Sequence, residues 1–153
     1  MKKIITVDIE TYSPLDITEV GAYRYAQDPA FEILLLGCCL GEHDMPLVLD
    51  LSIYDDPRAT LRRVASWLFD ASYTKRAHNA AFEWWCLSEY LGLSWSERID
   101  WLQQWECSMI HALYCGLPAQ LGALGAALQQ PEDALKMKEG KALIRYFLSL
   151  IHI

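Results

Sequence analysis

The chain has 153 residues, of which 53% are hydrophobic and 22% charged, and its 13 basic and 20 acidic side chains give a net charge of −7 at pH 7. This length is typical of about one domain with a buried core, and the composition excludes global disorder. The apolar runs are far shorter than the ~18 residues of a membrane span, and the acidic balance argues against a broad basic face for nucleic-acid phosphates.

The cysteines and the N-terminus indicate a reducing, cytoplasmic setting. The number of cysteines is odd, and no C-x-x-C pair occurs, which argues against both a disulfide framework and a zinc site. We expect most of them to pack as small core residues. Asp8 and Glu10 interrupt the apolar N-terminal stretch, so the sequence predicts no secretory signal.

The N-terminal third predicts three strands. A strand over 4–10 alternates, with Ile5, Val7 and Ile9 on one face and polar residues on the other. Residues 17–31 look like a loop with a short helix. Strands over 31–40 and 46–51 follow, separated by a turn at 41–44, which predicts an antiparallel meander. The uniformly aliphatic face of the first strand favours a central position in the sheet.

The remainder predicts mainly helices. Asp55-Asp56-Pro57 opens a helix through Phe69, with the proline in its first turn. A short strand over 73–77 leads into a helix over 80–91, and residues 95–106 give no clear pattern. Helices over 108–114 and 121–128 follow, the second with Leu121, Leu124 and Leu128 expected in the core, and an amphipathic helix covers 139–153. This order predicts an α/β or α+β domain with a mixed sheet.

Asp8 and Glu10 form the first candidate chemical motif. A period of two places both carboxylates on one face of the strand, near its C-terminal end, where open α/β sheets bind ligands. Such a pair can share divalent cations, and an enzyme that meets phosphates through metal ions needs an acidic site of this kind. Taken alone, Asp-x-Glu is more often a solvated strand face.

The second candidate motif is His78-Asn79-Ala80-Ala81-Phe82-Glu83, where a strand ends and a helix begins. Asn79 is well suited to cap this helix, and an acid in the first turn is favoured by the helix dipole alone. The functional interpretation is that the turn directs Glu83 across the sheet toward Asp8.

Together, these segments resemble the first two motifs of the DEDD superfamily of 3′–5′ exonucleases, Val7–Thr11 matching the first and His78–Glu83 the second. The similarity is greatest to the proofreading exonuclease domain of phage-type family A DNA polymerases, and it spans nearly the whole chain. Supporting stretches are Gly21–Ala26, Phe31–Leu34, Trp105 with Cys107 and Met109, Gly116–Pro118 and Lys136–Phe147.

The resemblance implies an RNase H-like α/β fold, with a three-stranded antiparallel meander in a mixed sheet flanked by helices. Two departures stand out. Glu83 occupies a position where the superfamily usually has Asp, which we interpret as a feature of the phage-type branch. The third motif, a Tyr or His followed four residues later by Asp, does not occur after Glu83. We therefore expect residues 1–153 to be a single exonuclease-like domain that is incomplete at its C-terminus.

The implied reaction is hydrolysis of the terminal phosphodiester at the 3′ end of single-stranded DNA, releasing a 5′-mononucleotide. Two Mg²⁺ or Mn²⁺ ions would flank the scissile phosphate. By this resemblance Asp8 bridges both ions, Glu10 binds the water-activating ion and Glu83 serves the other. Thr11 and Asn79 would contact the substrate.

The resemblance also implies partners and a setting. The missing exonuclease segment and a polymerase domain would lie downstream in the same protein, in the cytoplasm of a bacterial host and of phage or prophage origin, with no membrane partner. Two alternatives stay open: a non-catalytic nucleic-acid-binding or scaffold fragment of the same fold, and a 3′–5′ exonuclease directed at RNA. Because the third motif is absent, the 153-residue chain is expected to bind metal with little or no activity.

Overall fold

The computed structural model describes residues 3–41 and 45–131. The chain divides into two compact units, Met1–Ser108 and Met109–Ile153. The turn predicted at 41–44 falls largely outside the described residues, and the helix predicted over 139–153 falls wholly outside them.

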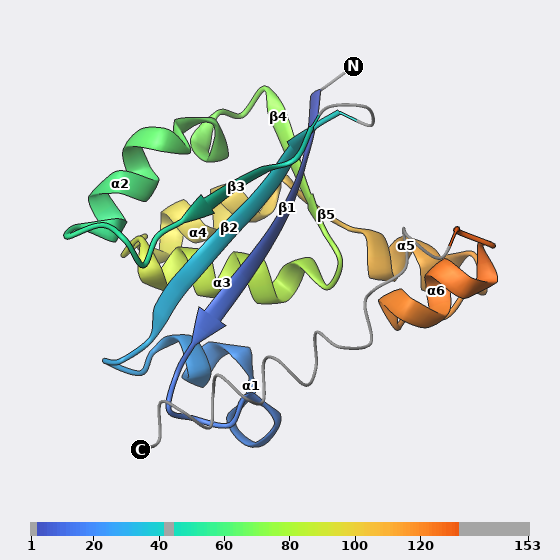
Figure 1. Ribbon diagram of the computed structural model, residues 1–153, viewed down its shortest axis with the longest axis horizontal. Coiled ribbons are helices and arrows are strands. Elements are labelled where there is room, and N and C mark those ends of the chain that lie inside the picture. The colour runs from blue at the N-terminus through green and yellow to red at the C-terminus, as the bar shows by residue number, and fades with distance from the viewer. Residues whose placement is uncertain (1–2, 42–44, 132–153) are drawn as a thin grey trace. The chain divides into compact units, whose positions relative to one another are not determined.

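The first unit is built on a mixed five-stranded sheet in the order β3-β2-β1-β4-β5 (Figure 1). The meander β1-β2-β3 is antiparallel, whereas β4 runs parallel to both β1 and β5. The predicted meander and the central place of β1 are therefore confirmed, and this mixed sheet is compatible with an RNase H-like fold. The strands are β1 (Lys3–Tyr12), β2 (Glu32–Leu40), β3 (Leu47–Asp50), β4 (Tyr73–Ala77) and β5 (Trp105–Cys107).

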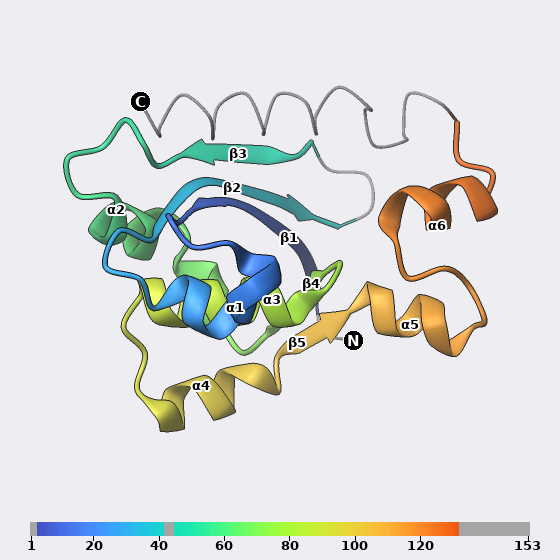
Figure 2. The ribbon, with the colours of Figure 1, turned by 90° about the horizontal axis from the view of Figure 1, so that it is seen from below.

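Helices connect these strands and cover one face of the sheet, as the edge-on view in Figure 2 shows for α1 and α3. The first unit contains α1 (Ile17–Ala26), α2 (Pro57–Val64), the 3-10 helix η1 (Ser66–Phe69), α3 (Ala80–Tyr90) and α4 (Trp95–Leu102). Helix α5 (Ser108–Tyr114) begins at the last residue of this unit, and α6 (Leu121–Ala127) lies in the second unit.

Two predicted elements differ from the structure. The single helix expected over 57–69 is divided at Ala65, whose φ of −105° and ψ of 37° are not helical, so that α2 ends and η1 begins there. Residues 95–106, which show no clear pattern in the sequence, contain α4 and most of β5. A capping box explains the start of α4, because the Ser94 hydroxyl accepts from the Glu97 amide while the Glu97 carboxylate accepts from the Ser94 amide.

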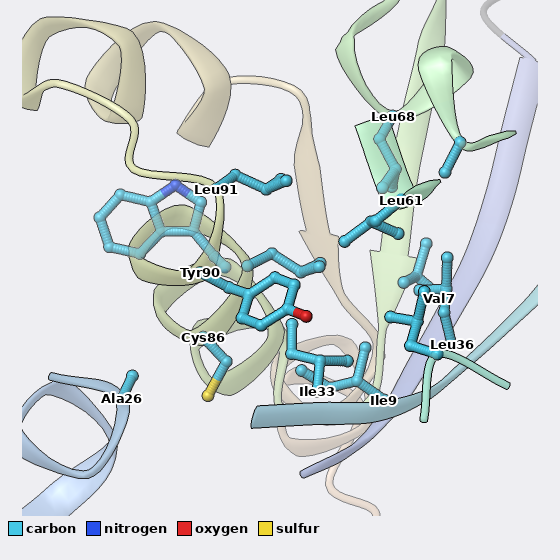
Figure 3. Close-up of a cluster of buried hydrophobic side chains, with 14 of the residues drawn as sticks. Val7, Ile9, Ala26, Ile33, Leu36, Leu61, Leu68, Cys86, Tyr90 and Leu91 are labelled. Carbon is cyan, nitrogen blue, oxygen red and sulfur yellow. The ribbon is translucent and has the colours of Figure 1, made fainter. Parts of the chain in front are cut away.

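The core lies between the sheet and these helices. Figure 3 shows strand side chains such as Val7 and Leu36 facing Leu61 and Leu68 of α2 and η1. The alternation predicted for β1 is confirmed, because its aliphatic residues are buried and its intervening polar residues are exposed. Burial of one face of the strand therefore fixes its register and leaves Asp8 and Glu10 on the other face.

Leu121, Leu124 and Leu128, in and just after α6, were wrongly expected in the core. Leu121 and Leu128 are 48% and 50% exposed, and no residue of α6 is buried among the described residues. The cysteine expectation holds in part, since Cys38 and Cys86 are buried and Cys115 is exposed. All five cysteines fall within the described residues, and all are free thiols. No described helix is both long and apolar enough to span a membrane.

Candidate active site

The first candidate carboxylates lie on the solvent-facing side of β1. Asp8 and Glu10 are both exposed. In the antiparallel ladder with β2, Asp8 pairs with Gly37 and Glu10 pairs with Leu35, and the register shifts between Glu10 and Thr11. A bulge at this point locally disrupts the ladder and redirects the strand just after the second carboxylate.

Gly37 is the cross-strand neighbour of Asp8 and carries no side chain. Residues that face one another across an antiparallel ladder project on the same side of the sheet. A Cβ atom placed on Gly37 would lie 3.9 Å from the Asp8 Cβ and 3.7 Å from its carbonyl oxygen, which is ordinary contact. A larger side chain at this position would therefore grow alongside the Asp8 carboxylate, whereas glycine keeps that approach open.

The junction between β4 and α3 brings the second motif toward β1. The parallel register of these strands runs only from Lys3 with Tyr73 to Thr6 with Arg76. Beyond Thr6, β1 continues without its parallel neighbour in the ladder, while β4 ends and the chain turns into α3. The first turn of α3 consequently starts beside the part of β1 that carries Asp8.

Asn79 makes this turn possible in a way that the sequence did not predict. It precedes α3, but its side chain makes no capping hydrogen bond, so the predicted capping role is wrong. Its backbone instead adopts the left-handed conformation, with φ 71° and ψ 47°, which asparagine tolerates better than most residues. The side chain of Asn79 is exposed and is not used to hold the helix.

The end of β4 is also anchored to β5. Arg76 forms an ion pair with Glu106 at 2.8 Å. Next to it, His78 Nδ1 lies 3.1 Å from Ser108 Oγ, and the Ser108 hydroxyl donates to the carbonyl of Ala77 at 3.3 Å. Ser108 thus lies within hydrogen-bonding distance of both His78 and the Ala77 carbonyl. These contacts hold the start of the His78–Glu83 turn against β5 and Ser108.

Glu83 is the most perturbed group of the site. Glu83 is only 3% exposed, and its Oε2 atom has no hydrogen-bond partner among the described residues. Burial raises the pKa of Glu83 to about 8, a hydrogen bond from its own backbone amide opposes this rise, and the negative charge of Asp8 adds to it. Asp8 and Glu83 are thus close enough to interact electrostatically.

Asp8, Glu10 and Glu83 do not form a closed cluster of three ligands in the described structure. Over residues 3–41 and 45–131, no group of three His, Cys, Asp or Glu side chains is arranged to hold a metal ion. The three-carboxylate site therefore stays a prediction, in which the Asp8 and Glu83 pair has structural support.

Tyr25 is a residue of this region that the sequence analysis did not single out. Its hydroxyl lies 3.2 Å from Oγ1 of Thr11, the residue predicted to contact substrate. The sequence signal was present only as part of the Gly21–Ala26 stretch of the resemblance. Periodicity could not find it, because Gly21 breaks α1 with φ 74° and ψ 162° and thereby changes the face that Tyr25 presents.

Comparison with known proteins finds similarity to a phage polymerase. The chain is 36% identical over 146 residues to a DNA polymerase of Bacillus phage SP02. The match covers 95% of this chain and 21% of the polymerase, so the chain spans about a fifth of that relative's length. No family model matches the chain.

Proposed function

We propose that this chain is part of a phage-type DNA polymerase and supplies most of its 3′–5′ proofreading exonuclease, which removes mononucleotides from the 3′ end of a DNA strand. The similarity to a phage DNA polymerase supports the polymerase origin. The observation that carries the exonuclease assignment is the buried Glu83 carboxyl, with one oxygen unpartnered among the described residues, in the field of Asp8.

This arrangement fits a divalent cation. A buried carboxylate with one oxygen unpartnered is unfavourable, and a second negative charge nearby makes it more so. A cation between the two groups relieves both penalties, whereas a neutral hydrogen-bond donor relieves only the first. Mg²⁺ and Mn²⁺ are the natural candidates, because both prefer carboxylate oxygens and accept further ligands from water and phosphate.

The residues of the site then have separate roles. Asp8, Glu10 and Glu83 would hold the metal ions, whose contribution would be to activate water and to stabilise charge on the 3′ oxygen. Thr11 and the exposed Asn79 side chain contact the terminal nucleotide. The absence of a side chain at Gly37 leaves room for the substrate to approach Asp8.

The proposal includes a polymerase region in cis, which agrees with the chain spanning about a fifth of its relative. No Tyr- or His-x-x-x-Asp follows Glu83 within the 153 residues. Hydrolysis depends on positioning, and a misplacement of ~1 Å costs roughly a hundredfold in rate. We therefore expect the chain to digest DNA only when the segment encoded next in its parent reading frame supplies that motif.

Digestion of 5′-labelled single-stranded DNA with Mg²⁺ or Mn²⁺ tests the function. We expect stepwise 3′–5′ shortening by the product of the full parent reading frame, abolished by Asp8→Ala, and little shortening by residues 1–153. An RNA oligonucleotide of the same sequence should be digested much more slowly. A full product that carries the third motif and binds DNA but stays inactive would favour a non-catalytic binding module, and faster digestion of RNA would favour the RNA-directed enzyme.

A further inference from the structure

The Tyr25 hydroxyl tethers the end of β1. Tyr25 is 8% exposed, and its hydroxyl lies 3.2 Å from Thr11 Oγ1. Thr11 follows Glu10 directly, at the register shift between β1 and β2. Because a bulge disrupts the ladder where it occurs, a side-chain hydrogen bond at this point adds to the ladder in holding the strand end.

The ring of Tyr25 contacts the start of α3 as well. Its centroid lies 6.4 Å from that of Phe82, the neighbour of Glu83, and 5.6 Å from that of Phe31. Burial raises the pKa of the Tyr25 hydroxyl, and its hydrogen bond with Thr11 opposes this rise. Tyr25 therefore lies between the two segments that carry the candidate metal ligands.

Helix α1 holds Tyr25 firmly in this place. Asp16 caps the helix by accepting from the Thr18 amide at 2.8 Å. Past the break at Gly21, Gln27 donates to the Glu89 carboxylate of α3 at 3.2 Å. The bond from Gln27 to Glu89 links the C-terminal end of α1 to α3. The Tyr25 side chain then bridges α3, through Phe82, and β1, through Thr11.

We propose that Tyr25 is a positioning residue, which holds the Glu10 end of β1 at a set spacing from the Glu83 end of α3 and thereby sets the spacing of the metal-binding carboxylates. This inference rests on the proposed function, since it assumes that these carboxylates share metal. Tyr25 acts through Thr11 and Phe82 and does not itself bind the metal.

Mn²⁺ binding to the 153-residue chain, measured by calorimetry without DNA, tests the proposal. Tyr25→Phe and Thr11→Val each remove one hydroxyl from the same hydrogen bond. We expect each to weaken Mn²⁺ binding by about three- to tenfold, and the double variant to weaken it no further than either one alone. Tyr54→Phe, which removes the hydroxyl of an exposed tyrosine, is the matched control and should leave the affinity unchanged.

Repeating the measurement in a Glu10→Gln variant separates an effect of Tyr25 on the position of Glu10 from an effect on overall stability. In Glu10→Gln, Tyr25→Phe should have little further effect on Mn²⁺ affinity, because the ligand that it positions is gone, although any loss in melting temperature should persist. Equal losses of affinity with and without Glu10 would overturn the positioning role.

The Asp8→Ala variant distinguishes a failure of the positioning role of Tyr25 from a failure of the metal site itself. If Asp8→Ala weakens Mn²⁺ binding while Tyr25→Phe and Thr11→Val do not, the positioning role is wrong and the metal site stands. If Asp8→Ala leaves Mn²⁺ binding unchanged, the proposed site itself fails, and this inference fails with it.

Discussion

Gly37 lies directly across the β1–β2 ladder from Asp8, so the nearest cross-strand neighbour of this carboxylate carries no side chain. The backbone of Gly37 needs no left-handed conformation, and a Cβ there would meet only ordinary contacts. Stability therefore does not require glycine at this position, which makes the space beside Asp8 the better explanation for it.

The first prediction tests whether residue 37 matters for the stability of the fold or for the approach of substrate to Asp8. Gly37→Ala should keep or raise the free energy of unfolding, by about 0.5–1 kcal/mol, because glycine inside a strand is entropically unfavourable. Gly37→Leu should fold yet slow DNA digestion by the full parent protein by about tenfold or more, since its side chain obstructs the approach to Asp8. Urea denaturation and the digestion assay measure the two effects. A Gly37→Leu enzyme as fast as the wild type would contradict the assigned role.

The second prediction concerns the pH dependence of stability. The pKa of Glu83 is raised from 4.5 to about 8 in the folded chain. Between these values the folded state keeps a proton that the unfolded state has lost, so stability should fall as pH rises, by up to about 1.4 kcal/mol per pH unit. Glu83→Gln should flatten this slope in urea denaturation series from pH 5 to pH 8.

Glu89 offers a control of opposite sign within the same helix. A hydrogen bond from Arg98 lowers the pKa of Glu89, and the Arg98 Nη2 atom lies 2.7 Å from its carboxylate. The stability that this pair provides is present above the unfolded pKa of Glu89 and is lost as pH falls through the folded one. Glu89→Gln should therefore destabilise the chain more at pH 7 than at pH 3. An unchanged pH slope in Glu83→Gln would show that Glu83 is ionised in the folded chain.

The third prediction uses cysteine reactivity to report on the packing behind the site. Burial, with a smaller contribution from the charge of Glu83, raises the pKa of Cys86 to about 12, and its residue is 0% exposed. Iodoacetamide at pH 8 should label the exposed Cys115 quickly and leave Cys86 unlabelled until denaturant is added. Peptide mass spectrometry gives both rates, and labelling of native Cys86 as fast as Cys115 would mean that α3 does not pack as described.

The fourth prediction tests the start of α4. Ser94→Ala removes the hydroxyl that caps this helix and should lower the free energy of unfolding by about 1 kcal/mol. Ser66→Ala is the matched control, because Ser66 begins η1 and is exposed. Urea denaturation of both variants checks the difference. Equal effects of the two substitutions would argue against the capping box.

Much of this structure follows from local sequence, as β1 and α3 illustrate. Period-two alternation in Ile5–Glu10 predicts both the strand and the exposed carboxylates, because burial of one face settles the register. The helix after Asn79 and the place of Glu83 in its first turn are likewise correct. Strand β5 was missed because three residues are too few for a periodic signal.

Other features depend on contacts that no local pattern encodes. The resemblance predicted that Glu83 is directed toward Asp8, but its burial and raised pKa follow only from the packing of α3 against the core. Asn79 has the residue type of a cap, yet the sharp turn from β4 to α3 requires its left-handed backbone instead. The hydrogen bond between Tyr25 and Thr11 joins two different elements. Helical periodicity does not predict it, because the non-helical backbone of Gly21 changes the direction of α1 before Tyr25.

The early end of the β1–β4 register at Thr6 has a mechanical consequence. The half of β1 that carries Asp8 and Glu10 is paired only with β2, whereas the first half, up to Thr6, is paired with both β2 and β4. Substitutions that loosen β2 will therefore move the two strand carboxylates directly. Substitutions that shift β4 will instead displace Glu83 through α3, so that the two halves of the site respond to disturbances of different strands.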